Sequence, residues 1–106
     1  MSVEHMVWFR FREDVEQARR DAYAEKLRLL AGRVPGIQRL EVGWNFTDRA
    51  RGAQLGLLVT LESREALDAY QVHPEHAVVA RGLRADCDEI QALDFEPCLG
   101  LEPGTG

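Results

Sequence analysis

The chain has 106 residues, 45% of them hydrophobic and 29% charged, which is typical of one globular domain and excludes disorder as the main state. With 13 basic and 18 acidic residues the formal net charge is -5, which disfavours nucleic acid and anionic membrane surfaces as main partners. The sequence has no apolar run of the roughly 18 residues that span a bilayer, no secretory signal pattern at its start and no CxxC spacing of its cysteines. We therefore expect a cytoplasmic protein with reduced thiols.

The first strand is predicted over residues 3–12, where side chains alternate with a period of two. The odd-numbered side is apolar apart from His5, so this side is expected to face the core. Met6 and Trp8 on the other side also need cover. A monomer of this size has too few residues to cover a second apolar surface. The pattern therefore favours an interface with another chain.

A helix is predicted to follow, with Asp14 as its N-cap and Gln17 completing a capping-box-like pattern. Residues at helical spacing are expected to face the core, and Pro35-Gly36 should end the element. These core-facing residues are Ala18, Ala22, Tyr23, Leu27, Leu30 and Val34.

Two further alternating segments, residues 37–46 and 54–61, predict a second and a third strand. Residues 47–53 form a polar connection that suits a hairpin with a long loop, so the two strands are expected to be antiparallel neighbours. The apolar sides carry Leu40, Val42, Trp44 and Phe46 in one strand and Leu55, Leu57, Val59 and Leu61 in the other.

Ser63 is a favourable N-cap for a helix that must end before Pro74, and Pro74 suits the first turn of a second, short helix. One face of that second helix carries His76, Val79, Ala80 and Leu83. His76 is therefore expected to point inward, at the start of an apolar stripe.

A last strand is predicted around residues 89–96, and its facing is ambiguous. The order β-α-β-β-α-α-β then matches the ferredoxin-like plan, an α+β fold with one four-stranded antiparallel sheet and helices on one face. We expect a domain over residues 1–97 and a tail over 98–106. The open sheet face is predicted to close a two-fold homodimer through Met6, Trp8, Leu58 and Ile90.

The chain resembles the stress-responsive α/β-barrel (Dabb) family, whose members are dimeric α+β barrels. The matching segments are residues 3–7, 34–37, 41–43, 61–63 and 69–76. The most specific part is the pattern Tyr-x-x-His-Pro-x-His at residues 70–76, together with His5. The resemblance extends to a plant polyketide cyclase of this fold, which closes a linear polyketide by an aldol step.

The resemblance implies that the functional Tyr and His of that cyclase fall on Tyr70 and His76, and its inward His on His5. The third strand departs from the cyclase, because Leu55 stands where the cyclase has another pocket His, and Tyr23 only partly replaces its first-helix aromatic residues. The substrate is therefore not expected to carry over.

His76 has the chemistry of a general base, because partial burial and a helix start both favour neutral imidazole. The hydroxyl of Tyr70 could hold a substrate carbonyl and stabilise its developing negative charge, and His5 could orient the ligand or the His76 ring. A purely structural interpretation stays open for each residue. His76 could be a buried histidine bonded to a backbone carbonyl or to Tyr70, Tyr70 a core aromatic residue, and His5 a buried structural histidine. Expected pocket walls are Phe9, Trp44, Leu55, Leu57 and Val79.

His73 and His76 with His5 form only a weak metal pattern, so we predict no metal. No phosphate-binding or dinucleotide motif indicates a cofactor, and Cys87 lacks a nucleophile motif. The leading functional hypothesis is a homodimer that binds a small, apolar, carbonyl-bearing molecule, with His/Tyr acid–base chemistry of a cyclase or lyase type. The alternatives are a non-enzymatic structural dimer and a cofactor-free monooxygenase, the latter on fold analogy alone.

Overall fold

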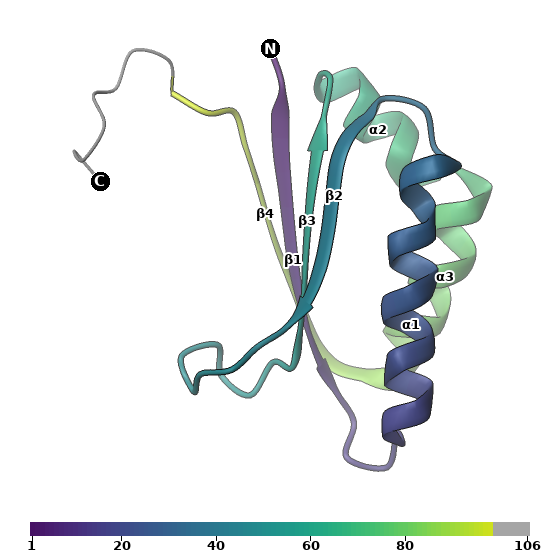
Figure 1. Cartoon of the computed structure of the whole chain (residues 1–106), viewed down its shortest axis with the longest axis vertical. Helices are drawn as coiled ribbons and strands as arrows, with labels where there is room; N and C mark the ends of the chain where they lie inside the picture. The colour runs from purple at the N-terminus through teal and green to yellow at the C-terminus, as the bar shows by residue number, and fades with distance from the viewer. Residues whose placement is uncertain (99–106) are drawn as a thin grey trace.

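Four strands form one antiparallel sheet in the order β2-β3-β1-β4 in the computed structural model, which describes residues 1–98 (Figure 1). The strands are β1 (Val3–Phe11), β2 (Ile37–Trp44), β3 (Leu55–Leu61) and β4 (Cys87–Phe95). The helices are α1 (Gln17–Leu29), the 3-10 turn η1 (Leu30–Gly32), α2 (Arg64–Val72) and α3 (Pro74–Asp86). This arrangement confirms the predicted ferredoxin-like fold.

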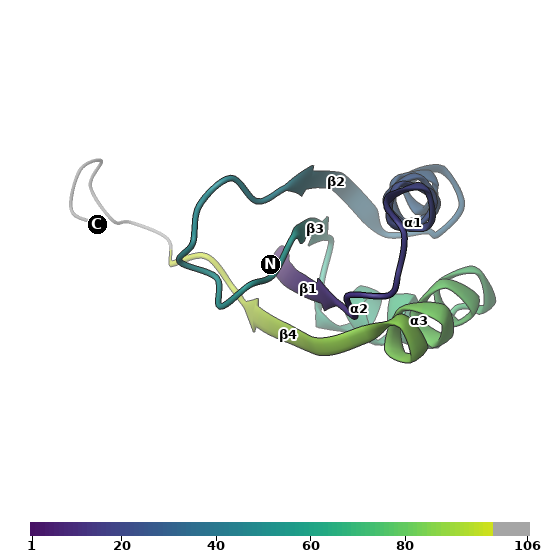
Figure 2. The same ribbon diagram turned by 90° about the horizontal axis from the view of Figure 1, so that it is seen from below.

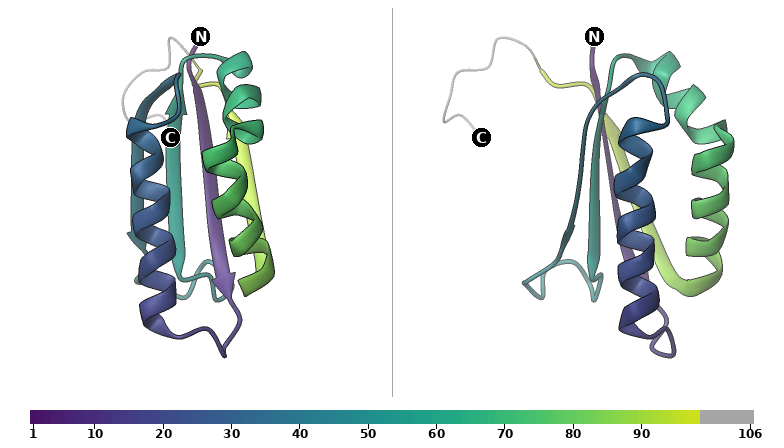
Figure 3. Two further views of the ribbon diagram at one scale, coloured as in Figure 1. Left: turned by 90° about the vertical axis from the view of Figure 1, so that its right-hand side faces the viewer. Right: turned by 45° about the vertical axis from the view of Figure 1, so that its right-hand side comes forward.

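The helices all lie on one face of the sheet, and the opposite face has no helix over it (Figures 1 and 2). α1 packs beside β2, whereas α3 packs beside β4 (Figure 3). The core lies between these layers, and the central strands β1 and β3 bury every second residue in it, as the sequence pattern predicts. None of the helices within residues 1–98 is long and apolar enough to cross a bilayer.

The start of α1 differs from the prediction. Asp14 does not cap the helix, because its carboxylate accepts two hydrogen bonds from the guanidinium of Arg12, at 3.0 and 3.1 Å. The helix begins at Gln17 after Glu16, which makes no side-chain capping bond. Ala18 and Ala22 are exposed, contrary to the prediction, whereas Tyr23 and Leu27 of α1 are buried, as are Leu30 and Val34 after it.

The connection between β2 and β3 is longer than predicted. β2 ends at Trp44, and Phe46 lies beyond the strand with 95% of its surface exposed. The side-chain amide of Asn45 donates to the carbonyls of Thr47 and Ala53, so it closes the loop instead of extending the strand. This loop projects on the helix-free side of the sheet (Figure 1).

The C-terminal half follows the predicted caps but not the predicted helix length. The Ser63 hydroxyl accepts from the backbone N–H of Ala66 at 3.1 Å, as expected of an N-cap. α3 runs for 13 residues and β4 begins at Cys87, two residues before the predicted strand. Asp86 explains the difference, because its buried carboxylate holds the end of α3 in the core.

The register of β4 corrects the predicted composition of the helix-free face. Ile90 pairs with Phe9 and therefore faces the helices, whereas Leu93 pairs with Met6 and shares the helix-free face with it. The predicted tail begins at Cys98, which is exposed, and residues 99–106 lie outside the described residues.

Candidate functional site

A cavity of about 180 Å³ lies between the helices and the half of the sheet formed by β1 and β4. Most of its wall is apolar, and its polar side chains are His5, Gln71, His76 and Arg84. Ligand pockets typically exceed about 300 Å³, whereas an apolar cavity of about 150 Å³ is large enough for benzene. The enclosed space therefore fits one small ring or a short chain, and a larger ligand would extend out of it.

His76 lies in the first turn of α3, after Pro74, and is only partly exposed. Its Nδ1 lies 3.1 Å from the backbone carbonyl of Gln71. A carbonyl only accepts hydrogen bonds, so Nδ1 carries the proton and Nε2 keeps its lone pair. Burial lowers the pKa of His76 below its ordinary value, and the charges of His5 and Arg84 add to this effect. The ring is therefore neutral at pH 7 and basic at Nε2.

Tyr70 lies near the end of α2 and is completely buried. Its ring centroid is 4.4 Å from that of His76 and 5.7 Å from that of His5, so the topology brings the three predicted residues together. Its hydroxyl has no hydrogen-bond partner among residues 1–98. Burial raises the pKa of Tyr70 far above its ordinary value, so the hydroxyl stays protonated and can only act as a donor or neutral acceptor.

Tyr70 does not line the cavity, which differs from the predicted site. Its ring lies behind those of His5 and His76, both of which do line it. Because Tyr70 is completely buried and does not line the cavity, a ligand group reaches its hydroxyl only if neighbouring side chains move.

His5 is 4% exposed and is bonded through Nδ1 to the carboxylate of Asp94 on the neighbouring strand β4. The two residues are direct cross-strand partners in the β1–β4 register. A carboxylate accepts, so this bond places the His5 proton on Nδ1. Sequence reasoning missed Asp94 because the facing of the last strand was ambiguous; only the pairing with β1 shows that the two residues share a side.

The structure places some of the predicted wall residues at the cavity and others away from it. Phe9 and Leu57 line the cavity, whereas Leu55 and Val79 are buried in the core without reaching it. Trp44 lies on the edge strand β2, lines a separate hollow beside α1 and is 43% exposed. It is excluded from the cavity because β3 and β1 separate β2 from β4.

The remaining lining residues were not predicted. Ile90 and Ala92 belong to the strand of ambiguous facing, and Gln71 and Arg84 were assigned no role in the pocket. The helical spacing of His76, Ala80 and Arg84 is the signal that could have identified Arg84.

His73 has a structural role, since its Nδ1 accepts from the backbone N–H of Glu75 at 3.1 Å and caps α3. Within the described chain, no group of three or more His, Cys, Asp or Glu side chains is arranged to hold a metal ion. Burial raises the pKa of the Cys87 thiol to about 11, so at neutral pH this residue is protonated and a poor nucleophile.

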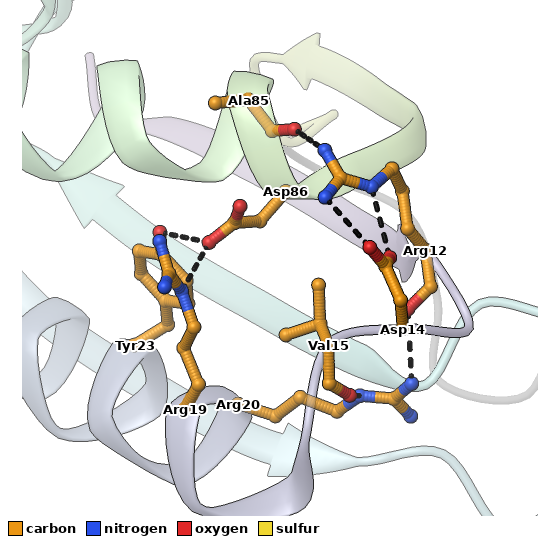
Figure 4. A network of polar contacts seen from close by, with 8 residues as sticks. All are labelled: Arg12, Asp14, Val15, Arg19, Arg20, Tyr23, Ala85 and Asp86. Carbon is orange, nitrogen blue, oxygen red and sulfur yellow. Dashed lines mark hydrogen bonds and ion pairs between the residues drawn. The ribbon is translucent and has the colours of Figure 1, made fainter.

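A second polar cluster lies at the other end of the helix layer, where Asp86, Tyr23 and Arg19 meet (Figure 4). The buried carboxylate of Asp86 accepts from the Tyr23 hydroxyl at 2.6 Å and from Nε of Arg19 at 2.5 Å. The hydrogen bond from Tyr23 is the main cause that lowers the pKa of Asp86, and Arg19 adds to it. The cluster joins α1 to the end of α3, and its buried Tyr23 hydroxyl has a partner.

Known proteins are similar to this chain in sequence or in fold. The chain is 22% identical over 99 residues to olivetolic acid cyclase of Cannabis sativa, covering 92% of this chain and 98% of the cyclase. The structure of hydroxynitrile lyase from Passiflora edulis matches with a TM-score of 0.86 at 19% identity, over 95% of this chain and 97% of the lyase. A dimeric ferredoxin-like protein of unknown function from Jannaschia sp. CCS1 matches with a TM-score of 0.80 at 29% identity, over 92% of this chain and all of the other.

These structural likenesses show the ferredoxin-like fold. The sequence adds a family assignment, because residues 3–97 match the family described as Stress responsive A/B Barrel Domain. The match covers the sheet, the helices and every residue of the candidate site. The chain therefore belongs to the stress-responsive A/B barrel domain (Dabb) family.

Proposed function

We propose that this protein binds a small, largely apolar, carbonyl-bearing molecule in the cavity beside His76 and acts on it by acid–base chemistry. The observation that carries the proposal is the pairing of a neutral His76 with the buried, unpartnered hydroxyl of Tyr70. A buried polar group without a partner costs stability, and such groups call for an explanation. A ligand carbonyl that accepts from Tyr70 is that explanation.

In this mechanism Nε2 of His76 removes a proton from the carbon next to the ligand carbonyl. The electron pair of the broken C–H bond moves toward the carbonyl oxygen, where the Tyr70 hydroxyl donates to the developing negative charge. His76 becomes an imidazolium and returns the proton later in the reaction. Its Nδ1–H bond to the Gln71 carbonyl stabilises that charged state, while burial opposes it and keeps the proton mobile.

Two relatives support an enzymatic role, because their names describe a cyclase and a lyase. His5 acts in this scheme as a positioning residue: Asp94 holds its ring, and the ring contacts Tyr70 edge to face at 5.7 Å. Apolar side chains of Phe9 and Leu57 contact the body of the ligand. No cofactor or metal is needed for this proton transfer.

The test uses ligands that report proton removal without a known product. A thermal-shift screen of aromatic acids, phenols and β-keto compounds first finds molecules that stabilise the protein. For each hit that carries a C–H bond next to its carbonyl, as the β-keto compounds do, NMR then follows deuterium uptake from D₂O at that carbon. We expect His76→Ala to lower this exchange about 100-fold or more, whereas Val78→Ala, on an exposed part of the same helix, leaves it unchanged. Equal exchange in both variants would remove His76 as the base.

We further propose that the helix-free sheet face closes a homodimer. Met6, Trp8 and Leu58 line a broad hollow of about 790 Å³ on this face, and Leu93 lies beside Met6 with 52% of its surface exposed. An apolar patch of this kind usually marks an interface, and solved relatives from Bacteroides fragilis, Thermobifida fusca and Jannaschia sp. are described as dimeric.

Sedimentation velocity of Leu58→Glu tests the dimer. The buried charge should convert the protein to monomers at micromolar concentration, because it would face apolar side chains of the partner. Val78→Glu is the matched control, since Val78 is an exposed apolar residue on the helix layer. A dimer that survives Leu58→Glu but not Val78→Glu would move the interface to the helices.

A non-enzymatic structural dimer is a second candidate, favoured by the bond between His5 and Asp94 and by the small cavity. It predicts no hit in the ligand screen and strong destabilisation by His76→Ala. A cofactor-free monooxygenase gains no supporting observation from the described residues. The cytoplasmic location and the lack of a nucleic-acid partner stay predictions.

A further inference from the structure

Arg84 is the one strong cation in the wall of the cavity, among residues 1–98. It lies in the last turn of α3, two helical turns after His76 and on the same face. Its side chain is exposed and makes no ion pair or hydrogen bond with any described residue. The rest of the wall is apolar apart from His5, Gln71 and His76.

The lack of a partner sets Arg84 apart from most arginines of this chain. Acidic residues outnumber basic ones by 18 to 13, so carboxylates are plentiful. Seven arginines pair with one, namely Arg10, Arg12, Arg19, Arg28, Arg33, Arg39 and Arg64. No Asp or Glu among residues 1–98 lines the cavity, and Asp94, which is bonded to the lining residue His5, is already engaged. The cavity therefore has a cation at its wall and no free anion to balance it.

We propose that Arg84 makes this cavity selective for a small carboxylate, with the apolar body of the ligand inside and its carboxylate on the guanidinium. This inference rests on the proposed ligand-binding function and names the class of ligand. Arg is suited to the role because its planar fork matches the two oxygens of a carboxylate. The size of the cavity limits the enclosed body to about one aromatic ring.

A ligand carboxylate on Arg84 would also act on the candidate base. The positive charge of Arg84 is one of the causes, after burial, that hold the pKa of His76 below its ordinary value. Neutralising that charge favours the imidazolium, so the bound ligand would make His76 a stronger base. Recognition of the anionic end and activation of the base would then be linked through one side chain.

The test compares benzoate with acetophenone, two probes of similar shape that differ in charge, by NMR titration of the whole protein. Wild type should bind benzoate about tenfold more tightly, a modest ratio because Arg84 is partly solvated. Arg84→Gln should bring the two affinities together, and Arg84→Lys, which keeps the charge without the fork, should give an intermediate ratio. Arg81→Gln is the matched control, because Arg81 is an exposed arginine one turn earlier on α3 that does not line the cavity.

The outcomes separate the two proposals. Equal binding of both probes by wild type overturns the role of Arg84 and leaves the ligand-binding cavity in place. Loss of the preference in Arg81→Gln as well as in Arg84→Gln also overturns it, because the effect would then come from the overall charge. Failure of both probes to shift any resonance of the cavity residues overturns the binding proposal and this inference together.

Discussion

Two tyrosines, Tyr23 and Tyr70, bury their rings between the helices and the sheet, with 6% and 0% of their surfaces exposed. The Tyr23 hydroxyl donates to Asp86 at 2.6 Å, whereas the Tyr70 hydroxyl has no partner within residues 1–98. A buried hydroxyl without a partner costs about 1–3 kcal/mol. The Tyr23 region is therefore arranged for stability, and the Tyr70 region keeps a donor free beside a neutral imidazole.

The contrast extends to the groups around each ring. At Tyr23 the carboxylate of Asp86 accepts hydrogen bonds from both the Tyr23 hydroxyl and the Arg19 guanidinium (Figure 4). At Tyr70 the neighbours are His5 and His76, which direct their Nδ1 protons to Asp94 and to the Gln71 carbonyl. Neither imidazole satisfies the hydroxyl. Mutations in the first region should change stability, and those in the second should change ligand chemistry.

The largest effect is expected from Asp86→Ala. It leaves the buried Tyr23 hydroxyl without an acceptor, so the free energy of unfolding should fall by up to about 3 kcal/mol. Urea unfolding measures the change, with Asp88→Ala, an exposed acid on β4, as the control. If both variants lose the same stability, the Asp86 cluster has no special structural role.

Gly82→Ala should weaken the same region by a steric route. An added Cβ would lie 2.8 Å from the Tyr23 hydroxyl oxygen and 3.0 Å from its ring. The ring or the helix must then shift, which disturbs the Tyr23–Asp86 bond at a cost of about 1–2 kcal/mol, partly offset by the higher helix propensity of alanine. Gly32→Ala is the control, because a Cβ there meets nothing within 4 Å. Thermal and urea unfolding of the two variants should differ clearly.

Tyr70→Phe should raise the free energy of unfolding by about 1 kcal/mol or more, because it removes a buried hydroxyl without a partner and keeps the ring. Tyr23→Phe should instead lose about 1 kcal/mol, since it removes a made hydrogen bond. Ligand binding or proton exchange should respond in the opposite order, falling in Tyr70→Phe and staying unchanged in Tyr23→Phe. A large loss of stability in Tyr70→Phe would contradict the comparison.

The smallest expected effect is the pH dependence of the free energy of unfolding, which differs between the Tyr70 and Tyr23 regions. The pKa of His76 is lower in the folded protein than its unfolded value of about 6.5, so the unfolded chain binds more protons below that pH. Stability should therefore fall as pH drops below about 6.5, and His76→Gln should flatten this decline.

The pKa of Asp86 is lowered from about 3.9, so its contribution persists as this decline begins and is lost only at more acidic pH. Urea unfolding of wild type and His76→Gln at a series of pH values measures both regions. A decline of equal slope in the two proteins would show that His76 does not cause it.

Local sequence signals predicted the elements well where few groups compete for the same bond. Ser63 caps α2 as expected, and the alternation along β1 and β3 matches their burial. Asp14 does not cap the helix because its carboxylate accepts hydrogen bonds from the guanidinium of Arg12, two residues earlier. A pattern of residue types cannot show which of two neighbouring partners a carboxylate will choose.

The site could be predicted only in part, for a similar reason. His5, Tyr70 and His76 meet as expected from the resemblance to the family, although Tyr70 lies behind the two imidazoles and not in the cavity wall. Asp94 and Arg84 were not predicted, and Trp44, a predicted wall residue, lies away from this cavity. Their positions depend on strand order and register, which join residues far apart in the chain.

The sequence by itself determined the order of elements, the core faces of the central strands and the inward placement of His5 and His76, because periodicity and capping act over a few residues. Only the tertiary structure decided that β4 pairs beside β1, bringing Asp94 to His5 and Ile90 to the cavity. It also decided that Tyr23 finds a carboxylate and Tyr70 finds none. The physical reason is that hydrogen-bond partners and cavity walls are set by contacts across the sheet and between helices, and these contacts have no local signature in the chain.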